Sequence, residues 1–276
     1  MIKLKQDEFV NKNREAWNEV TPIHVSHRKE EAKFFQQGGS TLDHFELKLL
    51  PDLQEKKVGH LCCNCGQDTL SLANLGAKCV GFDFSSAAIS EARRLSADSG
   101  IKVEFVESNV LDIPHEFYNN FDLIYISKGV LVWIPEVKQL IKSASKLLHQ
   151  GGKLFLYDQH PFTHLFDSDQ EGDLFAKFDY FKESPNEYKG LDYIGGTEYD
   201  ALPNYQFMVR LSDVLNGISE SGMKLDLFKE YDHSMFQQFP GMVKCEDGLF
   251  RFPKETGRTN IPMMMALMAT SVSSYE

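Results

Sequence analysis

Residues 60–84 read HLCCNCGQDTLSLANLGAKCVGFDF, a stretch that predicts a strand, a tight turn, a helix and a second strand ending in an aspartate. Val58–Cys62 and Lys78–Phe82 are short apolar runs of the kind that form buried strands. Residues 67–75 carry helical spacing, and the inner face of that helix is expected to hold Leu70, Ala73 and Leu75. In such a unit an acid about 20 positions after the turn can bind ribose hydroxyls. Asp83 stands at that position.

The turn lacks most of the glycines that a dinucleotide-binding loop requires. His60, Cys62 and Asn64 occupy the places of an acid and two glycines, and only Gly66 remains. Close approach of a pyrophosphate is therefore not expected. For this reason an NAD-dependent dehydrogenase is the least favoured of the functions considered. A cofactor without phosphates fits better. In S-adenosylmethionine the ammonium of the amino-acid end would favour Asp68.

Further segments follow in a fixed order along the chain: NREAWNEV at 13–20, GFDFSSAAISEAR at 81–93, FVESNVLDIP at 105–114, FDLIYISKGVLVWIP at 121–135, LLHQGGKLFLYDQHPF at 147–162, RLSDVLNGISESGM at 210–223 and IPMMMALMAT at 261–270. With the stretch at 60–84, this order resembles class I S-adenosylmethionine-dependent methyltransferases. The resemblance is greatest to a small-molecule subgroup whose first motif lacks its acid and first two glycines. His60 is therefore typical of that subgroup.

The resemblance implies an α/β fold in one domain, a doubly wound, seven-stranded Rossmann-like sheet with an antiparallel last strand. We expect an N-terminal helical lid over residues 1–50, a cofactor-binding core over 51–158, an aromatic insertion after the fifth strand over 159–204, and the C-terminal part of the core over 205–276. Ser40 or Thr41 is expected to cap the helix that follows. The insertion is rich in rings, which suits either enclosing a small organic substrate or packing only on itself.

The resemblance also implies a set of residues for S-adenosylmethionine. Asn109 is expected to read the adenine amino group, with Val110 offering a backbone N–H, and Trp17 is a lid candidate whose alternative is a core anchor. Ser127 lies at the carboxyl end of the fourth strand, where open α/β sheets bind their ligands. The cofactor-binding prediction comprises Trp17, His60, Cys62, Asn64, Gly66, Asp68, Asp83, Phe84, Asn109, Val110 and Ser127.

Methyl transfer needs alignment of donor and acceptor, and an acceptor with a proton to lose also needs a base. His160, at the end of the fifth strand, is the predicted catalytic base, with a turn residue bonded to backbone as the alternative. His164, Lys128 and Tyr199 are weaker candidates for the same pocket. The predicted substrate-binding residues are Lys128, Trp133, Tyr199 and Phe207.

Composition limits the partners of the chain. Its 276 residues carry 40 acidic and 29 basic side chains, a formal net charge of −11, which disfavours nucleic acid and anionic membrane surfaces. The opening residues lack the apolar core of a signal peptide, and no apolar run approaches the length of a membrane span, so a cytoplasmic location is expected. Cys62 and Cys65 form a CxxC near His60, but no second ligand pair for zinc exists, and reduced thiols without a metal are expected.

These patterns favour an S-adenosylmethionine-dependent methyltransferase that acts on a small-molecule acceptor by in-line displacement. The alternative is a cofactor-binding or regulatory protein of the same fold that binds S-adenosylmethionine or S-adenosylhomocysteine without catalysis. The missing glycines motivate this alternative, because fold alone does not determine function. The sequence leaves the methyl acceptor and the oligomeric state open.

Overall fold

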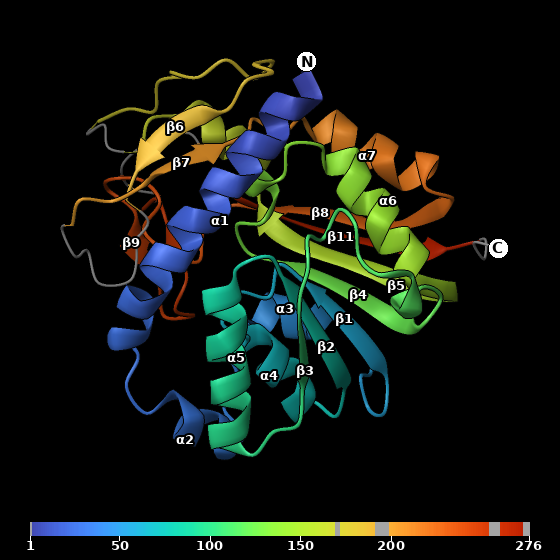
Figure 1. Cartoon of the computed structure of the whole chain (residues 1–276). Helices are drawn as coiled ribbons and strands as arrows, with labels where there is room; N and C mark the ends of the chain where they lie inside the picture. The colour runs from blue at the N-terminus through green and yellow to red at the C-terminus, as the bar shows by residue number, and fades with distance from the viewer. Residues whose placement is uncertain (1, 169–171, 191–198, 254–259, 273–276) are drawn as a thin grey trace.

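A seven-stranded sheet lies at the centre of the computed structural model, which describes residues 2–168, 172–190, 199–253 and 260–272 (Figure 1). The strand order is β3-β2-β1-β4-β5-β11-β8, and β11 runs antiparallel to both of its neighbours. The predicted doubly wound sheet with an antiparallel last strand is therefore confirmed. The strands are β1 Lys57–Leu61, β2 Lys78–Asp83, β3 Glu104–Glu107, β4 Phe121–Ser127, β5 Leu148–Gln159, β8 Met223–Tyr231 and β11 Met264–Ser271.

Helices cover both faces of the sheet because successive strand residues point to opposite sides. Leu123 and Tyr125 of β4 pack in one cluster with Leu72 of α4, whereas Ile124 and Ile126 pack in another with residues of α6 and α7. Burial on both faces explains why the strands are continuous apolar runs. The helices are α1 Ile2–Ser26, α2 Glu31–Gln36, α3 His44–Leu49, α4 Gln67–Asn74, α5 Ser86–Ser99, α6 Val137–Leu147 and α7 Leu211–Glu220, with short 3-10 turns η1 His115–Phe117, η2 Leu131–Trp133 and η3 Pro161–Leu165.

Two details of the predicted helices are wrong. The cap of α3 is Asp43, whose side chain accepts from the N–H of Glu46 while the Glu46 carboxylate accepts from the N–H of Asp43, so neither Ser40 nor Thr41 is the cap. Leu75 is 40% exposed because it follows the last turn of α4, and Leu72 is buried in its place.

A cap lies over one edge of the sheet and is built from two segments. The insertion contributes the hairpin of β6 Asn186–Lys189 and β7 Pro203–Gln206, beside which α1 runs in Figure 1. The second segment follows β8 in the chain, precedes β11, and includes β9 Val243–Lys244 and β10 Phe250–Arg251. It buries Phe239 and Met242 against Phe166 of the insertion. The insertion rings expected to enclose a substrate thus pack partly on this second segment, for which the sequence predicted no structure. One of these rings, Tyr193, lies outside the described residues.

Candidate active site

The turn after β1 has a left-handed backbone although two of its positions are not glycine. The φ angle is +57° at Cys62, +49° at Asn64 and +83° at Gly66. Left-handed conformations strain residues that carry a Cβ, asparagine less than most. A Cβ at Gly66 would lie 2.7 Å from the ring of Phe105, so glycine is required there. The turn therefore combines the backbone of a glycine-rich loop with side chains at Cys62 and Asn64.

Asp83 ends β2 and is buried, with 7% of its surface exposed. Its Oδ2 accepts from the N–H of Asn64 at 2.8 Å, and its Oδ1 accepts from the N–H of Ser85 at 2.9 Å. Burial raises the pKa of Asp83 to about 6, against the opposing effect of these backbone hydrogen bonds. Because each oxygen accepts only one of these two bonds, both keep capacity for ligand hydroxyls.

A second charged group on the wall of the same site is centred on Lys128. Its Nζ lies 2.8 Å from Oε2 of Glu46 and 3.4 Å from Oδ2 of Asp68. Asp68 also accepts hydrogen bonds from the hydroxyls of Thr41, at 2.5 Å, and Ser127, at 3.1 Å. Burial has the largest single effect and acts to raise the pKa of Asp68, but Lys128, His60 and the two hydroxyls together lower it. Asp68, predicted to attract a cofactor ammonium, is thus already paired with a cation of the protein.

His60 supports this wall as a neutral ring. Its Nδ1 lies 2.8 Å from the hydroxyl of Thr69, and its ring meets Tyr125 edge to face at 4.9 Å. Burial lowers the pKa of His60 to about 4, so the imidazole is uncharged at neutral pH.

A cavity of about 1130 Å³ opens at the carboxyl ends of β1, β2, β4 and β5. Of the predicted cofactor residues only Gly66 does not line it, because Gly66 is the N-cap of α4. The amide oxygen of Asn109 accepts from the N–H of Leu111 at 3.0 Å, which leaves that oxygen one lone pair for the predicted adenine contact. The predicted cofactor residues along the cavity are Trp17, His60, Cys62, Asn64, Asp68, Asp83, Phe84, Asn109, Val110 and Ser127.

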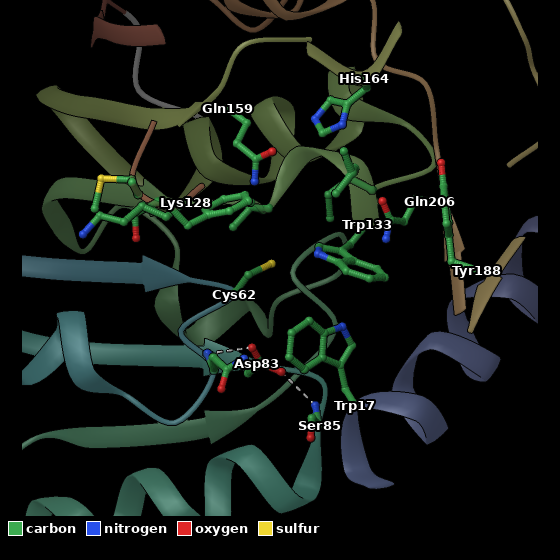
Figure 2. A pocket seen from close by; sticks show the side chains of 18 of the residues that line it. Trp17, Cys62, Asp83, Ser85, Lys128, Trp133, Gln159, His164, Tyr188 and Gln206 are labelled. Atoms are coloured by element: carbon green, nitrogen blue, oxygen red, sulfur yellow. Dashed lines mark hydrogen bonds between the residues drawn. The ribbon is translucent and has the colours of Figure 1, made fainter. Parts of the chain in front are cut away.

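Polar side chains enter the cavity from the side opposite Asp83. Figure 2 shows Gln159 and His164 there, with Tyr188 and Gln206 of the β6–β7 hairpin on an adjoining wall. His164 was a secondary candidate in the sequence, and Tyr188 is one of the insertion rings expected to enclose a substrate, whereas Gln159 and Gln206 were missed. Gln159 could have been found from its place at the end of β5, whereas no local pattern marks residues that only the folding of the hairpin brings to the cavity. Burial lowers the pKa of His164 to about 4, with a smaller contribution from His160.

His160, the predicted base, lies outside the cavity lining and is 2% exposed. Its Nδ1 accepts from the N–H of Phe162 at 3.1 Å and so caps η3, and its Nε2 lies 3.0 Å from Oε1 of Glu230. Burial lowers the pKa of His160, and Glu230 opposes this shift. The geometry matches the turn-residue alternative and does not favour the predicted catalytic role, since both ring nitrogens face protein groups.

The predicted substrate residues divide into two pairs. Lys128 and Trp133 line the cavity, but Tyr199 and Phe207 do not. Tyr199 packs against the buried cluster that contains Trp17, and the N–H of Phe207 donates to the carbonyl of Val132 at 2.7 Å. Tyr199 and Phe207 therefore support the wall from behind, since their surroundings are other protein groups.

Helix α1 closes one side of the cavity. The amide of Asn13 pairs with both backbone groups of Tyr205, donating to the C=O and accepting from the N–H, each at 2.7 Å. The ring of Trp17 meets that of Trp133 edge to face at 5.3 Å, and Trp17 lies beside Asp83 in Figure 2. Trp17 is thus buried and also lines the cavity, and its role as a lid stays a prediction.

Asp158 fixes the floor of the cavity at the end of β5. Its Oδ1 accepts from the N–H groups of Gly129 and Gln159, the latter at 2.7 Å. Its Oδ2 accepts from the N–H groups of Val130 and Leu131, both at 2.9 Å. This carboxylate is 1% exposed, and it holds the loop between β4 and η2 against β5.

Residues 58–152 match a family profile described as "Methyltransferase domain". An S-adenosylmethionine-dependent methyltransferase from Mesorhizobium loti superposes with a TM-score of 0.55 and 20% identity, over 81% of this chain and 94% of that one. Residues 58–152 thus match a methyltransferase domain, and the chain has the fold of S-adenosylmethionine-dependent methyltransferases. The predicted family resemblance is thereby confirmed. A structure from Listeria monocytogenes, assigned to the same kind of enzyme, gives a TM-score of 0.58 at 21% identity, over 83% of this chain and 96% of that one.

Curated relatives of the methyltransferase domain match part of the chain. A ubiquinone biosynthesis O-methyltransferase from Xanthomonas euvesicatoria is 30% identical over 105 residues, which are 38% of this chain and 44% of the relative. A protein of the same name from Xanthomonas oryzae is also 30% identical, over 42% of this chain and 47% of the relative. The chain thus spans less than half the length of these two relatives. Within the described ranges, no helix is both long enough and apolar enough to cross a membrane.

Proposed function

We propose that this protein transfers a methyl group from S-adenosylmethionine to a small-molecule acceptor. The observation that carries the proposal is one cavity with two chemically different ends. At one end stands the buried carboxylate of Asp83, and at the other stand Gln159 and His164 among aromatic rings. Ligands of open α/β sheets bind at this edge, and a cavity of this size can hold two small molecules.

The residues at the first end fit the cofactor. Asp83 presents two oxygens that are only partly used by backbone N–H groups, which suits a pair of ribose hydroxyls. Asn109 and Val110 line the neighbouring wall, where an adenine ring is expected. When bound, S-adenosylmethionine would supply a methyl group on a positively charged sulfur.

The protein would then have to align the acceptor and exclude water. One side of the cavity, along the path from one end to the other, is an apolar wall. It is formed by the paired rings of Trp17 and Trp133 and by the docked helix α1. Holding the methyl donor and the acceptor in one geometry can provide a large part of the rate acceleration, because the two reactants are already aligned when they meet.

An acceptor that loses a proton needs a nearby base, and we assign this part to His164. Its imidazole lines the cavity and is neutral at neutral pH because burial lowers its pKa, so that a ring nitrogen can accept a hydrogen bond or a proton. His160 remains the candidate drawn from sequence alone, and a single pair of variants separates the two.

The acceptor is proposed to be small and not a nucleic acid, because the net charge of −11 repels polyanions. The O-methyltransferase names of the partial relatives make a hydroxyl acceptor the first choice to test. A cytoplasmic location, one domain with the boundaries given above, and the absence of a resident metal stay predictions of the sequence.

Calorimetric titration with S-adenosylmethionine and S-adenosylhomocysteine tests the cofactor part directly. A ligand at 100 times its Kd should raise the free energy of unfolding by about 2.7 kcal/mol, which a thermal shift detects. Absence of both heat and thermal shift with either compound would overturn the proposal. Transfer of a labelled methyl group to a component of a metabolite extract then tests the reaction.

A binding protein without catalysis is the second candidate. The strained, non-glycine positions Cys62 and Asn64 favour it, because their side chains stand where a glycine-rich turn would leave space for the cofactor. Acceptor-dependent release of S-adenosylhomocysteine would eliminate this candidate. Tight binding of S-adenosylhomocysteine without any transfer would support it.

A further inference from the structure

Two glutamines from distant segments meet at the acceptor end of the cavity. Gln159 ends β5, and Gln238 belongs to the second segment of the cap. The Nε2 of Gln238 donates to Oε1 of Gln159 at 3.3 Å, and both residues line the cavity. Gln238 is 9% exposed, and its Oε1 is shielded from water without a hydrogen-bond partner among the described residues.

The pair offers one donor and one acceptor whichever way the amides are turned. As placed, the carbonyl of Gln238 and the NH₂ group of Gln159 remain for a ligand. If both amides were rotated by half a turn, the bond between them would reverse, and the carbonyl of Gln159 and the NH₂ group of Gln238 would remain. A ligand that satisfies the pair must therefore carry both a hydrogen-bond donor and an acceptor.

The NH₂ group of Gln159 lies over the exit of β4. A Cβ built at Gly129 would come within 3.4 Å of this nitrogen, an ordinary van der Waals contact, so the amide lies directly over the cavity floor. The floor itself is fixed, because Asp158 binds the backbone N–H groups of Gly129 and its neighbours. Figure 2 shows the Gln159 side chain extending into the cavity from the side opposite Asp83.

The surroundings of the pair are rich in rings, and most charges near them are paired within the protein. Asp167, Lys177, Glu187 and Lys189 line the cavity with charges of both signs, and Lys128, which also lines it, is held by Glu46 and Asp68. Lys177 lies 2.6 Å from Asp167 and is neutralised by it. The rings that line the same end are Phe166, Phe178, Tyr188, Phe236 and Phe239. Burying a charged ligand there would cost its hydration without a compensating ion pair.

We propose that Gln159 and Gln238 select uncharged, planar acceptors whose ring carries a hydrogen-bond donor beside an acceptor, as the N–H and C=O of a lactam do. This inference rests on the proposed function, because it names the acceptor class of that same cavity. The two amides bind and orient such an edge, and His164 stands at the same end to meet a hydroxyl on the ring. The amides recognise the acceptor and take no part in bond making.

The test uses three fused-ring probes of nearly equal size, titrated calorimetrically into the full chain saturated with S-adenosylhomocysteine. Quinolin-2-one carries the donor and the acceptor, 2-methoxyquinoline lacks the donor, and quinoline-2-carboxylate is an anion. Quinolin-2-one should bind at least about 10-fold more tightly than the other two, because the others leave a buried amide group unpaired. Gln159→Leu and Gln238→Leu should each remove this preference.

Gln237→Leu is the matched control, because Gln237 is the exposed neighbour of Gln238 and does not line the cavity. It should keep the preference of the parent. The selectivity of the parent protein decides the question even where a variant fails to fold. Equal affinities, preference for the anion, or no binding of any probe would overturn the inference.

The two proposals can fail separately. If S-adenosylhomocysteine does not bind, the proposed function fails, and the same three probes titrated into the protein alone still measure the selectivity of the glutamine pair. If S-adenosylhomocysteine binds but quinolin-2-one is not preferred, only the assignment of the acceptor class fails.

Discussion

Two buried aspartates lie at the carboxyl ends of β2 and β5, two strands separated by β1 and β4, and their oxygens accept different numbers of hydrogen bonds. Asp158 at the exit of β5 accepts from four backbone N–H groups, those of Gly129, Val130, Leu131 and Gln159. Asp83 at the exit of β2 accepts from two, those of Asn64 and Ser85. Both side chains are more than nine-tenths buried. The same residue type at equivalent strand ends is thus structural in one case and has capacity left for a ligand in the other.

The comparison indicates that a structural carboxylate is distinguished from a ligand-binding one by how many of its lone pairs accept no hydrogen bond from the protein. Burial distinguishes the two less well. A carboxylate offers about four acceptor sites. Asp158 uses all of them on the loop that forms the cavity floor. Asp83 keeps about half, and we therefore expect a pair of cofactor hydroxyls to bind at β2 and not at β5.

Removing the carboxylate that uses every site should have the largest effect. Asp158→Ala would leave several buried N–H groups unpaired, so we expect the free energy of unfolding to fall by about 4 kcal/mol. Urea denaturation measures this loss. Asp98→Ala, at an exposed surface ion pair, is the control and should change stability by less than about 0.5 kcal/mol. A loss below about 1 kcal/mol for Asp158→Ala would erase the distinction between the two aspartates.

Removing the carboxylate with capacity left should instead weaken binding. Asp83→Ala should lower the affinity for S-adenosylhomocysteine by about 10²-fold, because two charge-assisted hydrogen bonds to hydroxyls are lost. Asp68→Asn and Asn109→Ala should each have a smaller effect, and for Asp68 the reason is that Lys128 already pairs with it. Calorimetry on folded variants gives the ranking. Unchanged affinity for Asp83→Ala would mean that the ribose is bound elsewhere.

The acceptor end allows a direct contest between two histidines. His164→Gln should lower the rate of methyl transfer by about 10²-fold with little change in cofactor affinity, as expected when a positioned proton acceptor is lost. His160→Gln should have a much smaller effect on the rate, because its ring lies outside the cavity lining and caps η3. A rate that depends on His160 alone would restore the prediction made from sequence. Rates unchanged in both variants would leave alignment as the whole mechanism.

The pKa of Asp83 gives the comparison a pH dependence. Burial raises this pKa from 3.8 to about 6, so the folded state disfavours the charged form, and stability is lost as the pH rises from about 4 to about 6. Asp83→Asn lacks this titration. The free energy of unfolding of the variant, relative to the parent, should therefore increase by roughly 2 kcal/mol between pH 4.5 and pH 7. If the difference in the free energy of unfolding between variant and parent did not change with pH, then ionisation of Asp83 would not destabilise the folded state.

The smallest expected effect belongs to the wall between the two ends. Trp17→Leu removes the edge-to-face contact with Trp133 and should weaken S-adenosylhomocysteine binding by about 5-fold. Phe9→Leu is the matched control, since Phe9 contacts Tyr205 from the same helix and does not line the cavity. Equal effects of the two variants would mean that Trp17 acts only by docking α1.

The cofactor end could be predicted well because its parts are close in sequence. The turn at 62–66, Asp83 and the capping Ser85 lie within one βαβ unit, where strand length and turn chemistry fix their positions. The sequence did not reveal that Lys128 pairs with Asp68, because this contact joins segments 60 residues apart. The cap of α3 was also missed, since the reciprocal pair of Asp43 and Glu46 follows the two residues that were expected to cap it.

The sequence by itself determined the class of fold, through the family resemblance of its motifs, and the end of the cavity where the cofactor is expected, because periodicity and local turn chemistry place the strands and the turn between them. Only the tertiary structure decided the acceptor end. There Gln159, His164, Gln206 and Gln238 come from separate segments, and packing of the cap selects which of them face the cavity. His160 is the N-cap of η3, and His164 lies inside η3. The hydrogen bond that His160 accepts from the N–H of Phe162 keeps the His160 ring out of the cavity.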